Sequence, residues 1–507
     1  MGTTKRVAIA GAGVGGLAAA IDLATHGHAV TVFERKPGAG GKMSTVIVDG
    51  VAIDEGPTVL TMPWVFDGLF AAAGARFADY VQLRAAEILA RHVFPCGTAF
   101  DLFADEGRSA DAIGDAFGKR SADAFKRFQS ETRRIYDVVH GPFITAEAPS
   151  ALDVARHMAR MPSALVAIDA FRPMWKALTE RFEEPRLRRV FGRYATYCGA
   201  SPFEAPATFN VVSQVEARGV ARVDGGMAAL AAGLMALAKD KGVVFRFGHE
   251  VERLLGGGGG VRGVVVDGEP IAFDAVLWNG DLSAVATAVD GRAPKPTVPA
   301  DRSLSAVTWA VRARPRGVPL VHHNVFFTSE DYENEFVDLL GRKKTPATPT
   351  VYVCAQDRGD DDALRDGSER FLIIVNAPAT GDEPRRWTES ELASCEHAMS
   401  KTLAQCGLEL LSATSRVSTP VDFETRFPKT GGALYGPRPK SAMAPLSRLG
   451  ARTKVPGLYL AGGSVHPGPG VPMAALSGRL AAHAIDRDLT SIGRSRSAAI
   501  SGTTSTS

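Results

Sequence analysis

Apolar and polar positions near the start of the chain follow the order strand, helix, strand. Residues 5–10, which end in the apolar run Val7 to Ala10, predict a short buried strand. Residues 14–27 are small and apolar, as in a helix that packs on a sheet, and residues 29–33 predict a second strand. This order predicts a βαβ unit and places the chain in the α/β class.

The rest of the chain divides into helical and strand-like stretches. Residues 63–224 are mostly helical in pattern and are interrupted by prolines, which predicts an inserted segment. Five glycines at 256–260 predict a hairpin loop, because a phosphate loop would need a helix after it. The other predicted elements are strands at 46–53, 243–247, 250–255, 261–266, 270–278, 321–327 and 457–461, and helices at 227–241 and 472–486.

This order of elements predicts interleaved domains. A ligand-binding α/β domain is expected to be built from three separate segments, with two further segments on the substrate side and a Ser/Thr-rich end that we predict to be disordered. The three segments of the α/β domain are 1–62, 225–300 and 421–490, the helical insertion is 63–224, the mixed α+β substrate domain is 301–420, and the disordered end is 491–507.

Composition narrows the classes of function. The 507 residues are 45% hydrophobic and 22% charged with a net charge of +3, so nucleic acid is not an expected partner. No stretch reaches about 18 uncharged apolar residues, which predicts no membrane-spanning helix. The cysteines lack CxxC spacing, which disfavours disulfides and a zinc site and favours a cytoplasmic location. They are Cys96, Cys198, Cys354, Cys395 and Cys406.

A glycine motif stands between the first predicted strand and helix. Gly11, Gly13 and Gly16 have GxGxxG spacing, and Glu34 ends the next strand 23 residues after Gly11. The glycines permit a tight turn, close approach of a pyrophosphate and close helix packing, while the helix N-terminus attracts phosphate. Glu34 is expected to bind the adenosine ribose, and its charge disfavours NADP. The motif therefore predicts dinucleotide binding.

Further blocks resemble the glutathione-reductase-like flavoprotein superfamily, in its amine-oxidase branch. Residues 35–44 resemble its Gly-Gly-Arg segment, with Lys42 where arginine is usual, so bidentate phosphate contact is lost. Residues 54–58 resemble the segment along the isoalloxazine, and residues 457–463 resemble the strand that reaches the ribityl chain, although Ser464 to His466 replace the usual acid. The resemblance implies an FAD-binding Rossmann-type fold with FAD as cofactor.

The residues assigned to the cofactor follow from the glycine motif and this resemblance. They include a valine whose backbone is implied to contact the adenine. They are Gly11, Gly13, Val14, Gly15, Gly16, Glu34, Arg35, Gly41, Lys42, Gly56, Pro57, Thr58, Val251, Gly462, Gly463, Val471, Pro472 and Met473. No metal is expected.

Residues near the C-terminal end indicate which group of flavoproteins the chain resembles. Residues 463–472 resemble the His-Pro-Gly signature of bacterial carotenoid desaturases of the phytoene desaturase family, as do residues 197–207 and 322–336. Residues 40–43 and 473–478 are most similar to the hydroxycarotenoid 3,4-desaturases, also called methoxyneurosporene dehydrogenases. Phytoene desaturase is the main alternative, with carotenoid isomerase or oxygenase relatives behind it.

The resemblance implies an acyclic carotenoid as substrate. A hydride passes to the flavin, a proton leaves the neighbouring carbon, and a quinone or oxygen accepts the electrons. Because such a substrate must enter from a bilayer, a peripheral position on the inner membrane is implied. A helix at 161–178 and a basic run at 181–193 are candidates for that contact, with a core-packing helix and a solvated helix face as the alternatives.

No catalytic side chain is assigned. His466 is a candidate base by its position, although packing or a loop hydrogen bond is an alternative role. His322 and His323 are expected on opposite faces of a strand, so at most one would point to the substrate. Asp54 and Glu55 are expected to bind backbone or cofactor rather than to move protons.

Three other readings stay open. An amine oxidase on the same fold would need an aromatic cage at the flavin, which residues 464–473 do not offer. A lipid-binding protein of the GDP-dissociation-inhibitor type would not need the intact glycine motif and ribityl strand. An NAD-linked dehydrogenase would leave the flavin-side segments without a purpose.

Overall fold

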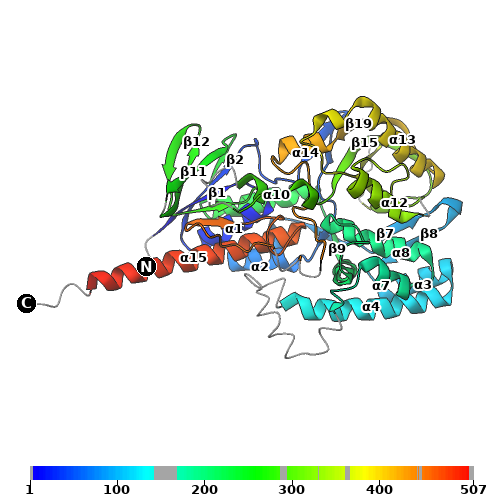
Figure 1. Ribbon diagram of the computed structural model, residues 1–507, viewed down its shortest axis with the longest axis horizontal. Helices are drawn as coiled ribbons and strands as arrows, with labels where there is room; N and C mark the ends of the chain where they lie inside the picture. Colours follow the sequence, from blue (N-terminus) through cyan, green and yellow to red (C-terminus); the bar gives the residue numbers. More distant parts are fainter. Residues whose placement is uncertain are drawn as a thin grey trace, which may run out of the picture.

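The computed structural model describes residues 4–141, 168–257, 259–285, 294–328, 331–359, 366–441, 444 and 448–501. Two lobes lie side by side (Figure 1). One holds the N-terminal βαβ unit, and the other holds a larger sheet with helices around it.

The first lobe, called here the nucleotide lobe, contains a five-stranded parallel sheet in the order β10-β2-β1-β14-β20. Its central strands carry branched apolar side chains on both faces, as parallel sheets covered on both sides require. The predicted βαβ unit is therefore present. The strands are β1 (Arg6–Ala10), β2 (Ala29–Glu34), β10 (Val244–Phe247), β14 (Ala275–Trp278) and β20 (Leu458–Leu460).

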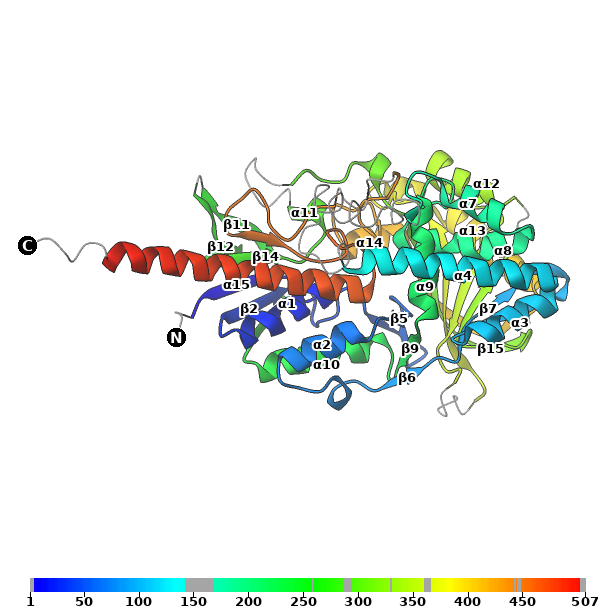
Figure 2. The same cartoon turned by 90° about the horizontal axis from the view of Figure 1, so that it is seen from below.

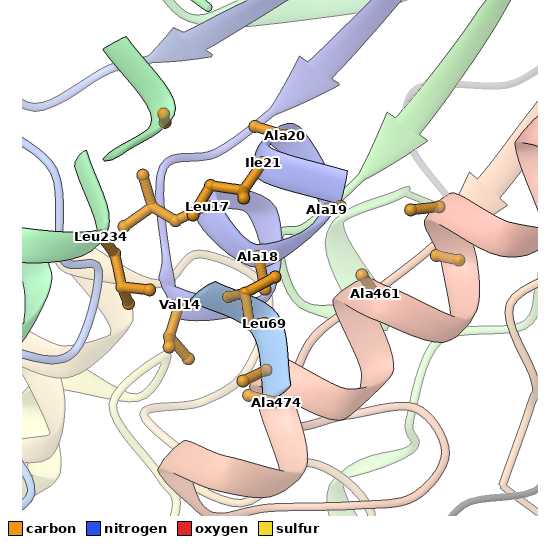
Figure 3. Packing of buried hydrophobic residues seen from close by; sticks show 14 of the residues in the cluster. Val14, Leu17, Ala18, Ala19, Ala20, Ile21, Leu69, Leu234, Ala461 and Ala474 are labelled. Carbon is orange, nitrogen blue, oxygen red and sulfur yellow. The ribbon is translucent and has the colours of Figure 1, made fainter. Parts of the chain in front are cut away.

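Helices cover this sheet and share one apolar core. Figure 3 shows Leu17 of α1, Leu69 of α2, Leu234 of α10 and Ala474 of α15 within it. Asp22 of α1 is buried and forms a salt bridge with Arg479 of α15 at 3.1 Å, so the first and last helices are also joined by charge. These helices are α1 (Val14–Thr25), α2 (Trp64–Ala72), α10 (Met227–Asp240) and α15 (Val471–Ser501).

Two predicted strands of this lobe are corrected. The single strand expected at 46–53 is a hairpin of β3 (Thr45–Val48) and β4 (Val51–Asp54). Asp49 and Gly50 both have positive φ, the conformation of a tight two-residue hairpin turn. The strand expected at 270–278 divides between two sheets, because its first half continues the antiparallel hairpin and its second half joins β1. The antiparallel strands are β11 (Val251–Gly257), β12 (Gly260–Val266) and β13 (Glu269–Ala272).

The second lobe is built on a seven-stranded sheet in the order β19-β15-β18-β17-β16-β7-β8. One face packs on α13 and the other on helices from the early part of the chain. Its strands are β7 (Ile88–Val93), β8 (Ala99–Phe103), β15 (Ser305–Gly317), β16 (His323–Phe326), β17 (Val351–Ala355), β18 (Glu369–Ala377) and β19 (Leu408–Ser418).

The insertion predicted as helical at 63–224 is therefore only partly helical. Its strands β7 and β8 complete the edge of the seven-stranded sheet, and β7 pairs in parallel with β16. A short three-stranded sheet of β5 (Leu60–Thr61), β9 (Val220–Val223) and β6 (Leu83–Ala85) joins the two lobes. The helices of this lobe are α3 (Glu106–Phe117), α4 (Lys119–Val139), α7 (Met174–Arg181), α8 (Pro185–Gly192), α9 (Val211–Ala217), α12 (Tyr332–Phe336) and α13 (Glu389–Gln405).

Helix α15 corrects the expected disordered end. It runs from Val471 to Ser501, so residues 491–501 are helical, and it extends past the body of the nucleotide lobe (Figure 1). No proline interrupts the sequence after Pro472 at the start of α15, so the helix begun in the core continues. Figure 2 shows α15 and α4 along the same side of the molecule. Among the described residues, no helix has both the length and the apolar character needed to span a bilayer.

Candidate cofactor site and active site

The glycine turn lies where β1 ends and α1 begins. Gly11 has φ of +104°, a conformation that favours glycine, and its amide donates to the Phe33 carbonyl at 2.8 Å. Gly13 precedes α1 without a side-chain cap, and the first turn of the helix contains no acidic residue. The amides and positive dipole of this helix end are therefore suited to a phosphate group.

Glu34 is buried at the end of β2, beside this turn. One carboxylate oxygen accepts from the Ala12 amide at 2.8 Å, and the other accepts from the Lys36 amide at 2.9 Å. The Glu34 carbonyl accepts from the amide of His249 at 3.1 Å, which brings the start of β11 and buried Val251 to the same corner. The structure thus brings together the acid and the valine that the sequence assigned to the adenosine.

Gly41 and Lys42 approach the glycine turn from the following loop. A Cβ atom at Gly41 would lie 3.0 Å from the Gly13 Cα, so this approach needs glycine. The Lys42 ammonium donates to the Leu434 carbonyl and lies 5.3 Å from the centre of the Phe427 ring. Burial lowers the pKa of Lys42. A nearby anion would favour the charged form of this lysine.

The C-terminal part of the site meets α1 at Gly15. A Cβ atom at Gly15 would lie 2.9 Å from the Ala474 carbonyl oxygen and 3.3 Å from the Gly462 amide nitrogen. Gly462 has φ of +114°, and Gly463 follows it. Val471, Pro472 and Met473 form the first turn of α15, directly before Ala474. The predicted C-terminal residues therefore lie beside the glycine turn.

Asn279 is a residue of this site that the sequence assignment omitted. Its side-chain amide donates to the Gly11 carbonyl at 3.1 Å, and its Oδ1 would lie 2.6 Å from a Cβ atom at Gly15. It directly follows β14 and begins the sequence Asn-Gly-Asp, which was the available signal. Asn279 holds the glycine turn against the C-terminal segment.

Gly56, Pro57 and Thr58 continue the site toward the second lobe. A Cβ atom at Gly56 would overlap the Lys42 carbonyl oxygen, so these two segments touch through backbone. The Thr58 hydroxyl and the Tyr352 hydroxyl are 2.7 Å apart, and Tyr352 lies 2.6 Å from Nδ1 of His323. A polar chain therefore runs from the cofactor segment into the second lobe.

Asp54 and Glu55 both have partners within the protein. Asp54 accepts from the Met227 amide at 2.6 Å, at the N-terminus of α10, and burial raises its pKa. Glu55 forms a salt bridge with Arg426 at 2.9 Å. Arg35, assigned to the cofactor, donates to the carbonyls of Thr425 and Arg426 at the end of α14 (Pro420–Arg426).

The second lobe presents an aromatic interior between its sheet and its helices. Phe128, Phe182 and Phe191 are buried and in ring contact with one another. Within this apolar region Arg193 and Glu216 form a buried pair at 3.5 Å, and the hydroxyls of Tyr194 and Tyr197 contact both charges. These aromatic rings and the buried ion pair are part of the packed core of this lobe.

The expected placement of the two adjacent histidines is wrong. The rings of His322 and His323 meet edge to face with centroids 4.5 Å apart. The reason is that β16 begins only at His323, so His322 lies in the preceding turn and strand alternation does not apply to it. His466 is buried, and its amide donates to the Leu449 carbonyl at 2.8 Å.

The structure describes only part of the first candidate membrane segment and all of the second. Residues 161–167 of the predicted helix at 161–178 lie outside the described residues, and in its described part Met174, Ala177 and Leu178 of α7 are buried. The basic run at 181–193 is engaged within the protein. Its ion pairs are Arg181 with Glu131, Arg186 with Glu184 and Arg193 with Glu216.

The chain matches a known protein family over nearly all of its length. Residues 14–486 match the family described as flavin containing amine oxidoreductase. The chain belongs to this family. As a flavin containing amine oxidoreductase it is an FAD-dependent enzyme, which confirms the predicted fold class and cofactor, and the glycine turn, buried Glu34 and the close backbone approach at Gly41 fit a dinucleotide.

Individual relatives show which proteins the chain resembles in sequence. A hydroxyneurosporene desaturase of Rubrivivax gelatinosus is 47% identical, over 99% of this chain and 97% of the relative. A hydroxyneurosporene desaturase of Cereibacter sphaeroides is 40% identical, over 96% of this chain and 99% of the relative. The predicted resemblance to carotenoid desaturases is confirmed. A putrescine oxidase structure with bound putrescine has a TM-score of 0.61 at 16% identity, covering 96% of this chain and 99% of that one, and supports the fold alone.

Proposed function

We propose that this flavin containing amine oxidoreductase is a carotenoid desaturase that introduces a C–C double bond into an acyclic carotenoid. The reaction proposed is 3,4-desaturation of a 1-hydroxycarotenoid in spheroidene or spirilloxanthin synthesis. The observation that carries the proposal is the 47% identity, over 99% of the chain, to a protein named hydroxyneurosporene desaturase. The continuous polar chain from the cofactor segment into an aromatic lobe supports it.

The FAD is held, in this proposal, by the three segments that meet at the glycine turn. The N-terminus of α1 with Gly13 takes the pyrophosphate, and Glu34 takes the adenosine ribose. Lys42 neutralises negative charge from the opposite side. Asn279 fixes the turn so that the C-terminal segment with Gly462 and Gly463 can approach the flavin half.

The second lobe supplies orientation and the exclusion of water. When bound, FAD would supply the acceptor for the hydride that leaves the saturated carbon beside the polyene. In this proposal the second lobe aligns the polyene and excludes water beside the flavin, and the packed aromatic core around Phe191 supports that lobe from within.

The electron acceptor is proposed to be a quinone or oxygen, and the substrate is proposed to enter from a membrane. A long polyene is insoluble in water, so direct transfer from a bilayer avoids its exposure. Because the described residues contain no helix able to span a bilayer, we infer a peripheral contact on the cytoplasmic side of the inner membrane.

The decisive experiment offers three substrates separately to the purified protein with liposomes, FAD and a quinone. The substrates are 1-hydroxyneurosporene, neurosporene and phytoene. Absorbance reports the red shift of a longer polyene, and mass spectrometry reports the loss of two hydrogens. Protein freed of FAD, and the holoenzyme without a quinone under anaerobic conditions, are the controls. Sedimentation with the same liposomes tests the membrane contact.

The outcomes separate the alternatives. A red shift with the hydroxylated substrate alone supports the proposal. Turnover of phytoene moves the assignment to phytoene desaturase. Binding of carotenoid without any turnover by the FAD-loaded protein contradicts the proposed activity and leaves lipid binding as the function.

A further inference from the structure

Three side chains with metal-ligating atoms meet in the second lobe, although no metal-binding motif connects them in the sequence. They are His322, His323 and Cys354, and their ligand atoms all lie within 4.8 Å of one another. His323 and Cys354 are 2% and 1% exposed, and His322 is half-buried. The Sγ atom of Cys354 is 3.5 Å from Nε2 of His322. This cluster is separate from the residues assigned to FAD.

Strand register brings two of the three together. His323 of β16 is the direct antiparallel partner of Cys354 in β17, so their side chains leave the sheet on the same face. Tyr352 stands two residues before Cys354 and therefore shares that face. The third residue, His322, reaches them from the turn before β16. Its ring stands nearly perpendicular to that of His323.

The turn that carries His322 is fixed by hydrogen bonds. The Asn324 side chain accepts from the Val321 amide at 3.0 Å and donates to the Val321 carbonyl at 2.6 Å. The carbonyl of His322 accepts from the Ala355 amide at 2.8 Å. The backbone on both sides of the cluster is therefore set before any ligand binds, which lowers the entropic cost of binding.

Metal-ligating histidines ordinarily hydrogen-bond through the ring nitrogen that does not bind the metal, and His323 has such a partner for Nδ1. Nδ1 lies 2.6 Å from the Tyr352 hydroxyl, while Nε2 is buried and has no hydrogen-bond partner among the described residues. When Nδ1 carries the proton, the bare lone pair of Nε2 is left inside the cluster. A buried lone pair without a partner is costly unless a ligand satisfies it.

We propose that His322, His323 and Cys354 bind one thiophilic divalent cation, with Zn²⁺ as the best match to two imidazoles and a thiolate. Ligand bonds of about 2.0–2.3 Å in a tetrahedral arrangement bring such atoms about 3.3–3.8 Å apart. The 3.5 Å between Sγ of Cys354 and Nε2 of His322 already lies in this range, and all the ligand atoms lie within 4.8 Å of one another. The Cys354 thiol releases one proton to solvent as the metal–sulfur bond forms, and a fourth position stays open.

Nearby charges permit a cation here. The carboxylates of Asp54 and Asp357 act on Cys354, and burial together with them raises the pKa of its thiol to about 12 in the metal-free protein. Burial lowers the pKa of His323, and so do the nearby His322, Arg193 and Arg222, which favours the neutral imidazole that a metal ligand needs. Arg193 is paired with Glu216, which offsets its charge.

A bound cation has a consequence for the cofactor site. Coordination through Nε2 fixes the proton of His323 on Nδ1, so Nδ1 donates to the Tyr352 hydroxyl. Tyr352 must then donate to the Thr58 hydroxyl, 2.7 Å away. The metal therefore sets the direction of the hydrogen bonds that end at the cofactor segment.

The test measures metal in the full-length, FAD-loaded protein. Zn²⁺ is supplied in the growth medium, and bound metal is measured by mass spectrometry after desalting. We expect about one Zn²⁺ per chain in the wild type. We expect at least a tenfold loss of bound metal in Cys354→Ala and in His323→Phe. Cys395→Ala is the matched control, because Cys395 is equally buried but lies in α13, outside the cluster, and it should retain the metal.

A second measurement needs no substitution. Protein stripped of metal with a chelator is titrated with Co²⁺, and a thiolate-to-cobalt absorption band in the near ultraviolet is expected to saturate at about one equivalent. The FAD absorbance of each sample reports whether the fold is intact. Wild-type protein that retains FAD but binds neither Zn²⁺ nor Co²⁺ overturns the proposal, as does equal metal binding by Cys354→Ala. Neither result depends on carotenoid turnover.

Discussion

Gly478 of α15 lies directly against the carbonyl oxygen of Gly15 in α1, so closely that a Cβ atom at Gly478 would overlap it. The same Cβ atom would lie 3.1 Å from the Ala19 amide nitrogen. The last helix is therefore packed on the backbone of the glycine motif itself. Any side chain at Gly478 must push α15 and α1 apart.

Substitution Gly478→Ala is expected to destabilise the protein by about 1–3 kcal/mol, as overpacking of a rigid interface does. The gain in helix propensity, about 1 kcal/mol, opposes this only in part. Urea unfolding followed by circular dichroism measures the difference. Gly257→Ala is the control, because nothing lies within 4 Å of its added Cβ atom. Equal stability of the two variants would contradict the close packing.

Substitution Glu34→Gln is expected to weaken FAD binding about tenfold or more, because charge-assisted hydrogen bonds to a ligand contribute about 1.5–3 kcal/mol. The change keeps the shape of the side chain but removes its charge. Quenching of flavin fluorescence during titration of FAD-free protein gives the dissociation constant. Glu269→Gln changes an exposed acid of β13, outside the residues assigned to the cofactor, and should bind FAD as the wild type does.

The carboxyl of Glu335 predicts a specific dependence of stability on pH. Burial raises its pKa to about 7, while Thr350 donates two hydrogen bonds to it. The unfolded chain releases this proton near pH 4.3, about the ordinary value, so the folded state binds more protons between about pH 4.3 and 7. The stability that the protonated carboxyl contributes is therefore lost as pH rises through this window. Above about pH 7 the group causes no further change in the free energy of unfolding.

Urea unfolding at pH 5.5 and pH 7.5 tests this, with Glu335→Gln as the matched variant. We expect the wild type to lose about 2 kcal/mol more than the variant between the two pH values, at about 1.4 kcal/mol per pH unit. The glutamine keeps an oxygen for Thr350 but does not titrate. Parallel curves for the two proteins would show that Glu335 is ionised in the folded state.

We expect the stability effects of substitutions at Arg193 and Glu216 to be strongly coupled, because the two residues form a buried ion pair. Their side chains are 5% and 4% exposed, so Glu216→Gln leaves an uncompensated buried charge and should cost about 3–5 kcal/mol. The double variant Arg193→Met, Glu216→Gln should cost less than the sum of the single changes. Glu183→Gln is the control, because it breaks an ion pair in which Arg120 is 84% and Glu183 is 78% exposed. It should change the free energy of unfolding by less than about 1 kcal/mol. Additive costs at the buried pair would exclude coupling.

The parts of the fold predicted from sequence are those in which neighbouring residues determine the structure. The strand, turn and helix from residue 5 to 27 follow from a local apolar pattern and from glycines that the turn requires. The hairpin at 45–54 was also encoded locally, in the Asp49-Gly50 turn, but the alternation on both sides hid it within one longer strand.

The parts that the sequence did not reveal depend on distant pairing. The run Ile88 to Val93 has no strict alternation because the strand is buried on both faces beside β16. Asn279 acquires its role only where β14 ends against the glycine turn. Cys354 stands 32 residues after His322 without motif spacing, and only the antiparallel register of β16 and β17 brings them together.

The interleaving of the chain determines when the enzyme can become active during its synthesis. The glycine turn leaves the ribosome before β20, which completes the sheet beside it, and before α15, which completes its helix layer. Gly462 and the first turn of α15 reach the turn only after the strands of both lobes have been synthesised. Until then a nascent chain has no complete dinucleotide cradle, so the second lobe must be made before the enzyme can hold FAD fully.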